Sequence, residues 1–135
     1  MQIRTANETD FSALVALDEY AQTSLARINE IRAAIERGMC WCALIAGEVV
    51  GYRIDSSNFF HRPFLELVTV KWAARGTGVA SALIAHFREQ HGAPVFSSCN
   101  ASNAPAQRML VAAGFRICGY IEGLDDGDPE VIYRA

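Results

Sequence analysis

The chain has 135 residues, of which 51% are hydrophobic and 20% are charged, so we expect a single folded domain over residues 1–135 rather than a disordered protein. Twelve basic against fifteen acidic side chains give a net charge of −3, which lacks the basic surplus typical of nucleic-acid-binding proteins. No apolar run approaches the roughly 18 residues of a membrane-spanning helix, and the first ten residues do not resemble a signal peptide. We therefore expect a cytoplasmic protein that binds neither nucleic acid nor membranes.

The N-terminal part of the chain predicts one strand followed by two helices. Alternating residue types over 2–6 predict the strand, and Asn7 or Thr9 is placed to cap a helix that covers residues 10–21. A second helix over residues 24–38 ends at a glycine. Its apolar stripe follows helical spacing and consists of Leu25, Ile28, Ile31 and Ile35.

The periodicity then changes from that of a helix to that of strands. Residues 39–57 predict two strands joined by a short hairpin turn at Gly47-Glu48. Residues 58–63 read as a loop that Pro63 closes. Residues 64–72 are rich in β-branched and apolar types, which predicts a central strand of a sheet.

The C-terminal part alternates helices and strands. It predicts a helix from about Val79 to Gln90, a buried strand over 94–100, and a helix that begins at Asn103 and ends at Gly114. Two final strands, over 115–124 and 130–135, flank an acidic turn. This order predicts an α/β (α+β) domain with a mixed sheet flanked by helices.

The four cysteines do not form a metal-binding pattern. The Cys40-x-Cys42 pair has no nearby histidine or cysteine cluster that would complete a zinc site. Cys99 and Cys118 stand alone in the sequence. We expect all four to be reduced thiols, mostly buried as small hydrophobic residues, and we expect no metal.

Two glycines stand where a strand leads into a helix, within the stretch Arg75-Gly76-Thr77-Gly78-Val79-Ala80. The first N–H groups of a helix have no partner inside it, and glycine lets a phosphate approach the backbone closely. A Walker loop would need a lysine after Gly78, and a dinucleotide fingerprint would need a third glycine where Ser81 stands. The turn therefore predicts a diphosphate site of another kind.

This turn, with the strand before it, resembles the GCN5-related N-acetyltransferases, the GNAT superfamily. Their pattern L-x-V-x-P-x-x-R-G-x-G-[IV]-[GA] is matched by Val68, Val70, Arg75, Gly76, Gly78, Val79 and Ala80. Their second pattern, N-x-x-A-x-x-x-Y-x-x-x-G-F, is matched by Asn103, Ala106, Gly114 and Phe115. The chain departs from the family at Trp72, in place of the proline, and at Leu110, in place of the tyrosine.

The resemblance implies a mostly antiparallel sheet whose central strands, over 64–72 and 94–100, splay apart around acetyl-CoA. It implies direct transfer of the acetyl group to a primary amine of a small molecule or a peptide. Backbone groups near Val68 and Val70 would pair with the pantetheine arm, and Asn103 would either reach that arm or only cap its helix. The pyrophosphate would be held by the backbone of Arg75, Gly76, Thr77, Gly78, Val79 and Ala80.

Glu66 is the candidate general base, because the resemblance places a glutamate in this strand. Period-2 parity places it on one face with Phe64, Val68 and Val70, among apolar neighbours. The alternative is an ion pair between Glu66 and Arg53, Arg62 or Lys71.

The identity of the proton donor to the leaving thiolate is left open, because Leu110 stands where the family has a tyrosine. Tyr120 is the first candidate, ahead of Tyr133, Ser98 and Cys99. Among the histidines, only His61 lies where an acceptor could enter, whereas His86 and His91 are expected on a solvated helix surface.

An acidic rim would favour a cationic acceptor, and it would consist of Asp18, Glu19 and Glu30 with Asp125, Asp126 and Asp128 of the last turn. A homodimer is also open, with the final strand over 130–135 as the pairing segment. Two alternatives remain: an acyl-CoA-binding module with little or no catalysis, and a nucleotide-binding α/β protein of another family.

Overall fold

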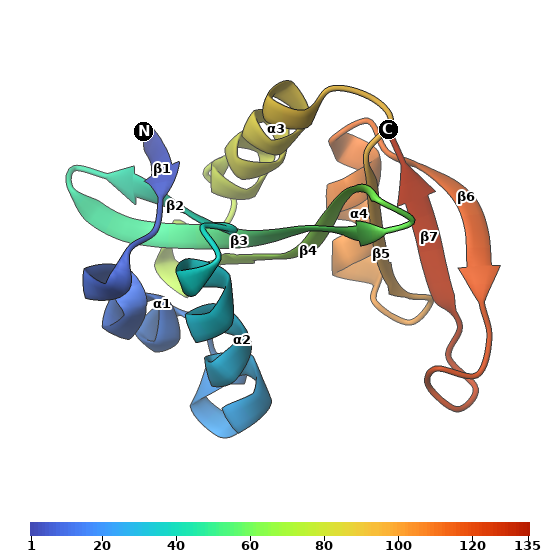
Figure 1. Cartoon of the computed structure of the whole chain (residues 1–135), viewed down its shortest axis with the longest axis horizontal. Helices are drawn as coiled ribbons and strands as arrows, with labels where there is room; N and C mark the ends of the chain where they lie inside the picture. Colours follow the sequence, from blue (N-terminus) through green and yellow to red (C-terminus); the bar gives the residue numbers. More distant parts are fainter.

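The computed structural model describes residues 1–135 and contains one seven-stranded sheet with four α-helices (Figure 1). The helices are α1 (Phe11–Leu17), α2 (Leu25–Glu36), α3 (Val79–His91) and α4 (Ala104–Ala112). The strands are β1 (Gln2–Thr5), β2 (Cys40–Ile45), β3 (Glu48–Phe59), β4 (Arg62–Val70), β5 (Phe96–Asn100), β6 (Arg116–Ile121) and β7 (Glu130–Arg134). Short 3-10 helices precede α1 (Glu8–Asp10), follow it (Tyr20–Thr23) and follow β4 (Trp72–Ala74).

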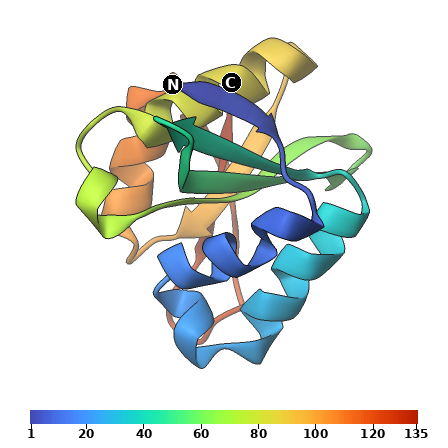
Figure 2. The same ribbon diagram turned by 90° about the vertical axis from the view of Figure 1, so that its left-hand side faces the viewer.

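The sheet is mostly antiparallel, as expected, and its strand order is β1-β2-β3-β4-β5-β7-β6. Only β4 and β5 run parallel. Helices α1 and α2 cover one face of its N-terminal half and α3 covers the other (Figure 2). Each interface has its own apolar core, centred on Leu14 and Ile31 for α1 and α2, and on Val79 and Leu83 for α3. None of the helices is long and apolar enough to cross a membrane.

The central strands β4 and β5 diverge after only two paired positions, Phe64 with Phe96 and Leu65 with Ser97. The hydroxyl of Ser97 donates to the Leu65 carbonyl over 2.8 Å and closes this vertex. Beyond it, one backbone edge of β4 has no strand partner, since β3 occupies the other edge. The splay that the family resemblance implied is therefore present.

Strand β4 carries a bulge at Glu66, and this corrects the parity argument for that residue. Ile54 of β3 pairs with Leu67 and the next residue, Asp55, pairs with Leu65, so Glu66 is the extra residue without a partner. Bulges shift side chains from one face of a strand to the other. Val68 and Val70 consequently pack with α3, while the charge of Glu66 acts on Glu30 of α2.

Four local predictions in the first half were wrong. The helix expected over residues 10–21 ends at Leu17, where Asp18 has an extended backbone, and a separate 3-10 helix follows over Tyr20–Thr23. The first hairpin turns at Ala46 and Gly47, both with positive φ, one residue earlier than expected. Residues 58–63 form a tight hairpin instead of a loop, because Phe59 pairs with Arg62 across the positive-φ residues Phe60 and His61. Leu25 is 72% exposed, since it begins α2 outside the buried stripe.

The prediction that the last strand could pair with a second copy of the chain was also wrong. Strand β7 inserts between β5 and β6 and pairs with both. Its backbone groups are therefore used within the chain, and residues 130–135 cannot pair across a dimer.

A buried arginine network joins β3 to α3 and corrects the prediction that His86 and His91 lie on a solvated face. Arg53 is fully buried, and its Nε and Nη2 bind the two carboxylate oxygens of Asp55 at 2.8 and 3.1 Å. Its other N–H groups reach the Leu83 carbonyl, His86 Nδ1 and Gln90, so all five donors have acceptors. His91 lies 3.4 Å from Asp55.

Candidate active site

A cavity of about 500 Å³ lies between the glycine turn, β4, α4 and the connection from α1 to α2. Five of the nine predicted cofactor-binding residues line it, namely Val68, Val70, Arg75, Ala80 and Asn103. Gly76, Thr77 and Gly78 follow Arg75 and lead into Val79, whose side chain is buried beneath the turn. The cavity therefore ends at the N-terminus of α3.

The glycine turn presents a run of backbone N–H groups without protein acceptors. The N–H groups of Gly76, Thr77 and Gly78 donate to no backbone or side-chain acceptor. Those of the first turn of α3 have no acceptor inside the helix. Gly76 and Gly78 have φ of 77° and 89°, a conformation that glycine adopts without strain. A Cβ at either glycine would meet no atom within 4 Å, so the space above the turn is open.

Arg75 is fixed in place beside this turn. Its Nε donates to the Val70 carbonyl over 3.2 Å, and its guanidinium lies 4.7 Å from the centre of the Trp72 ring. Trp72, which replaces the family's proline, is 70% exposed. It therefore supports Arg75 from the surface and does not pack in the core.

A second cavity, of about 350 Å³, lies in the splay between β4 and β5. Glu66, Ser98, Cys99, Asn100 and Glu130 line it. The two cavities share six lining residues, which are Arg27, Val68, Thr69, Asn103, Ala106 and Met109. A ligand in the first cavity is thus adjacent to the carboxylates of the second.

The two predicted catalytic residues lie in different places. Glu66 is exposed and lines the splay cavity, and it forms no ion pair with Arg53, Arg62 or Lys71. Lys71 pairs with Glu48 instead. Tyr120 is 63% exposed on the edge strand β6 and lines neither cavity. Leu110, on α4, is 1% exposed within the core and also lines the splay cavity.

Asn103 caps α4, since its side chain accepts the Ala106 N–H over 3.2 Å. Pro105 follows in the first turn of the helix, where its missing N–H leaves no bond unmade. The same side chain lines both cavities. Capping and contact with a ligand are thus both open to it.

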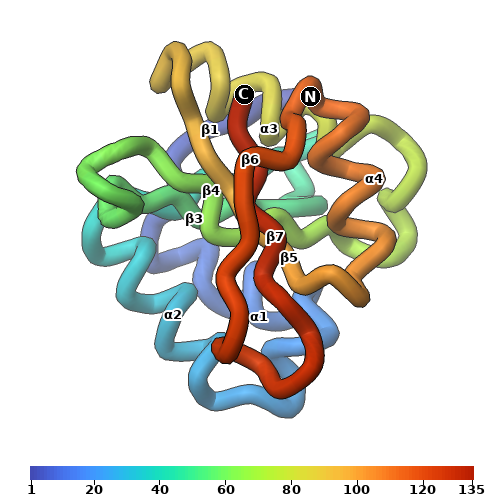
Figure 3. Tube along the Cα trace, turned by 90° about the vertical axis from the view of Figure 1, so that its right-hand side faces the viewer, coloured from blue at the N-terminus to red at the C-terminus, as the bar shows by residue number.

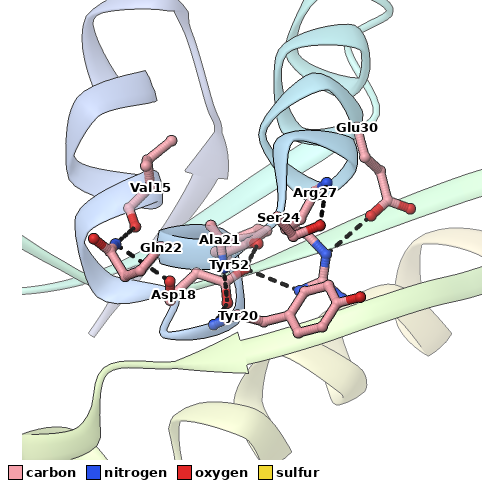
Figure 4. A network of polar contacts seen from close by, with 9 residues as sticks. All are labelled: Val15, Asp18, Tyr20, Ala21, Gln22, Ser24, Arg27, Glu30 and Tyr52. Atoms are coloured by element: carbon pink, nitrogen blue, oxygen red, sulfur yellow. Dashed lines mark hydrogen bonds and ion pairs between the residues drawn. The ribbon is translucent and has the colours of Figure 1, made fainter.

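The connection between α1 and α2 is held by a buried carboxylate that sequence patterns did not identify as structural (Figure 4). Asp18 is 2% exposed, and it accepts hydrogen bonds from the Tyr52 hydroxyl at 2.5 Å and from Arg27 Nη1 at 2.9 Å. The backbone N–H of Tyr20 donates to it as well. Burial raises the pKa of Tyr52, and the hydrogen bond to Asp18 adds to the rise.

Arg27 is the cation that the two cavities share. Its Nε lies 3.1 Å from Glu30, and its guanidinium lies 4.6 Å from the centre of the exposed Tyr20 ring. Burial raises the pKa of Glu30, and the negative charge of Glu66 contributes to the rise although Arg27 opposes it. Like charges thus gather at the rim of the splay.

Part of the predicted acidic rim has a structural task. Asp18 is buried and partnered, as described above. In the last turn, Asp125 accepts from Asn100 at 2.8 Å, and Asp128 accepts from the Ser102 N–H at 3.0 Å. These two carboxylates tie the β6–β7 connection to the last residue of β5 and to the segment that follows it.

Known proteins resemble this chain in sequence and structure. Residues 2–115 match the Acetyltransferase (GNAT) family. The structure of a GNAT-family acetyltransferase from Bacillus cereus ATCC 10987 has a TM-score of 0.90 and 31% identity, over 99% of this chain and 95% of that chain. A ribosomal-protein-alanine N-acetyltransferase from Brucella melitensis has a TM-score of 0.75 and 25% identity, over 100% and 99%.

A more distant protein from Salmonella typhimurium, solved with its cofactor acetyl-CoA, has a TM-score of 0.70 and 19% identity, over 99% of this chain and 92% of that chain. At this identity the likeness concerns the fold. No curated protein sequence matches the chain.

Proposed function

Because this chain belongs to the acetyltransferase (GNAT) family and transfers an acetyl group from acetyl-CoA to an amine, we propose how its own residues divide that task. The acceptor that we propose is a primary amine of a small molecule or a peptide. The observation that carries the proposal is the run of unpaired N–H groups from Gly76 into α3, beside a cavity that continues into the splay.

The residues present fit coenzyme A. Unpaired N–H groups at a helix N-terminus, with the partial positive charge of the helix, form an anion site. We assign the pyrophosphate to the backbone N–H groups of Gly76, Thr77, Gly78, Val79 and Ala80. The N–H of Arg75, which was predicted to take part, donates to the Trp72 carbonyl over 3.2 Å instead. The free edge of β4 near Val68 and Val70 offers backbone partners to the pantetheine amides, as an added strand would. Acetyl-CoA supplies the acetyl thioester.

Glu66 is the proposed general base. An ammonium cannot attack a thioester until it loses a proton, and the Glu66 carboxylate lines the splay cavity where an acceptor would meet the cofactor. The bulge aims this residue away from the α3 face and toward α2. We propose that it takes the proton directly or through one water molecule.

For the leaving thiolate, we propose that catalysis does not depend on a protein proton donor. Leu110 is an apolar core residue, and Tyr120 lines neither cavity. Ser98 and Cys99 do line the splay cavity, but Ser98 donates to Glu130 at 2.7 Å. A thiolate is a weak base and departs without full protonation, at a lower rate.

The carboxylates around the splay favour a cationic acceptor. Glu30, Glu66 and Glu130 lie on three different elements, and the latter two line the same cavity. A peptide N-terminus is one such acceptor, and the relative from Brucella melitensis is a ribosomal-protein-alanine N-acetyltransferase. Small cationic amines such as polyamines would be attracted by the same carboxylates. We also propose a cytoplasmic location, because the four cysteines are free thiols and reducing compartments keep thiols in that state.

The second candidate is an acyl-CoA-binding module with little catalysis, and the buried Leu110 favours it. One experiment separates the two. Coenzyme A should raise the Tm in either case, whereas ATP and NAD should not. Release of free thiol from acetyl-CoA with a panel of amino acids, polyamines, aminoglycosides and N-terminal peptides should occur only for the enzyme.

Glu66→Gln tests the base. It should lower the rate of thiol release and alter its pH dependence across neutrality, with little change in acetyl-CoA affinity. Glu36→Gln, an exposed glutamate at the end of α2, is the matched control. An unchanged pH–rate profile in Glu66→Gln would remove this residue from the base role.

A further inference from the structure

In the C-terminal half of the sheet, the face opposite α4 belongs to none of the apolar cores. Val131 and Tyr133 of β7 lie in the core beneath α4. Because side chains alternate along a strand, the other residues of β7 point away from that core, and these are Glu130, Ile132 and Arg134. None of these three belongs to an apolar core. In Figure 3, β6 and β7 lie in front, with α4 on one side of them and the β3–β4 hairpin on the other.

The charges on this face are separated along β7. At one end, Glu130 lines the splay cavity together with Glu66. At the other end, Arg134 pairs in register with Arg116 of β6, and both side chains are exposed. Ile132, which is 7% exposed, lies between the two ends. The face is therefore acidic beside the proposed general base and basic further from it.

The two arginines have no anionic partner in the chain. Neither Arg116 nor Arg134 forms an ion pair. Like charges in directly facing positions destabilise an antiparallel pair. A carboxylate from outside the chain would relieve this repulsion, and guanidinium groups bind carboxylates through charge-assisted hydrogen bonds.

Aromatic rings lie on this face between the splay and the arginines. Phe96 of β5 pairs in register with Arg134 on one side and with Phe64 of β4 on the other. The ring of Phe59, from the β3–β4 hairpin, lies 5.0 Å from that of Phe64 and 5.2 Å from that of Phe96. All three side chains are half-buried. They offer an apolar surface to a ligand that spans the two charged ends.

The spacing of these residues sets the length of such a ligand. Strands β4 and β7 lie on either side of β5, which separates them by about 10 Å. Phe64 is level with Arg134 across β5, and Glu66 lies two positions further along β4. The Cα atoms of Glu66 and Arg134 are therefore about 12 Å apart. An extended peptide advances about 3.3 Å per residue, so its fourth residue lies near the arginines when its N-terminal amine is at Glu66.

We propose that the acceptor is a peptide whose N-terminal amine binds at Glu66 and whose acidic side chain, near the fourth residue, binds to Arg116 and Arg134. This inference rests on the proposed acetyltransferase function and narrows its acceptor. The amine gives its proton to Glu66 and forms the C–N bond, while the C–S bond of the thioester breaks and its electron pair leaves on sulfur. The arginines only position the peptide. A polyamine of the same length would bring a second cation to the arginines, which would repel it.

Peptide binding to the protein saturated with coenzyme A tests the proposal without turnover, because coenzyme A carries no acetyl group. The probes are hexapeptides with a free N-terminal alanine that differ only at the fourth position, which is glutamate, glutamine or lysine. In isothermal titration calorimetry at low salt, the wild type should bind the glutamate peptide about tenfold more tightly than the glutamine peptide. The lysine peptide should bind more weakly than either.

Charge reversal separates recognition from a structural role. Arg116→Glu and Arg134→Glu should each abolish the preference for glutamate, because the new carboxylate neutralises the remaining arginine. The double variant should prefer the lysine peptide, an inversion that loss of a structural contact would not produce. Arg108→Glu is the matched control, since Arg108 is exposed on α4, and it should keep the wild-type preference. The Tm and the coenzyme A affinity of each variant show that the chain remains folded.

Four outcomes would overturn the inference: equal affinity of the wild type for the glutamate and glutamine peptides, no binding of any peptide, a double variant that still prefers glutamate, or tighter binding of spermidine than of the glutamate peptide. Each of these would leave the proposed function in place, provided that coenzyme A binds. Failure of coenzyme A to bind would instead refute the proposed function, and this inference with it.

Discussion

Tyr52→Phe should lower stability by removing one hydroxyl from a fully buried network. The hydroxyl donates to the carboxylate of Asp18, and both residues are at most 2% exposed. A hydrogen bond to a charged group contributes about 1.5–3 kcal/mol. With about 2.1 cal/mol/K of unfolding entropy per residue over 135 residues, this loss lowers the Tm by about 5–10 °C. Differential scanning calorimetry at pH 7 measures it.

The same substitution has a pH signature, because burial holds the pKa of Tyr52 above its ordinary value. A raised pKa means that the folded chain keeps the phenol proton more firmly than the unfolded chain does. This part of the stability is complete below the unfolded-state pKa of about 10 and declines as the pH rises above it. The difference in Tm between wild type and Tyr52→Phe should therefore shrink above pH 10.

The matched control is Tyr20→Phe, which removes an equal hydroxyl from a ring that is 61% exposed and lies in the same part of the molecule. Its stability should change by less than about 0.5 kcal/mol. The reasoning is refuted if both variants melt together with wild type, or if the difference for Tyr52→Phe is the same at pH 8 and pH 11.

Three further predictions test separate parts of the structure. Gly51→Ala should lower the free energy of unfolding by about 1–3 kcal/mol, because the new Cβ would lie 2.9 Å from Val79 Cγ1; chemical denaturation measures this, with Gly119→Ala, where no atom lies within 4 Å, as a neutral control. Thiol labelling of the native protein should modify the exposed Cys118 quickly and the other three cysteines slowly. Burial raises the pKa of Cys40 to about 12 and also raises the pKa values of Cys42 and Cys99. Rapid reaction of two or more thiols would contradict the burial of these three cysteines. Asn103→Ala should lower the free energy of unfolding by about 1 kcal/mol, and Asn103→Ser, which can also cap a helix, should restore it. If the serine variant regains stability but not coenzyme A affinity, Asn103 contacts the ligand. If both return together, Asn103 only caps α4.

Much of the fold follows from local patterns. The cap at Asn103, the glycine turn before α3 and the alternation of helix and strand were predictable, because short-range hydrogen bonds and backbone preferences determine them. Asn7 also caps a helix, but it is the 3-10 helix Glu8–Asp10 that leads into α1 and not α1 itself. The splay between β4 and β5 came from the family resemblance. The cofactor-binding residues at the glycine turn, on β4 and at Asn103 were identified in the same way, and five of them line one cavity.

Features that depend on long-range pairing were missed. A single unpaired residue at Glu66 reverses the face of every residue after it, and only the register with β3 reveals the bulge. Arg53 reads as a polar residue in a strand, yet three of its five hydrogen bonds go to residues 83–90 of another element. Asp18 read as a rim residue, because the hydroxyl of Tyr52 that binds it lies 34 residues away in the sequence. The position of β7 inside the sheet was equally invisible to local patterns.

The central claim is that the N-terminus of α3 holds the pyrophosphate, and Ala80→Asp tests it most directly. Ala80 lies in the first turn of α3 and lines the cavity. A carboxylate in the first turn favours the helix, so the fold should be retained. At about 6 Å and an effective dielectric constant of about 20, it repels each phosphate charge by about 2.8 kcal/mol.

Isothermal titration calorimetry with coenzyme A gives the answer. The account predicts saturable binding to the wild type, similar binding to Ser57→Asp, which carries the same added charge at an exposed position of β3, and at least about 100-fold weaker binding to Ala80→Asp. Absence of binding heat in the wild type, or equal affinity in all three proteins, would contradict it.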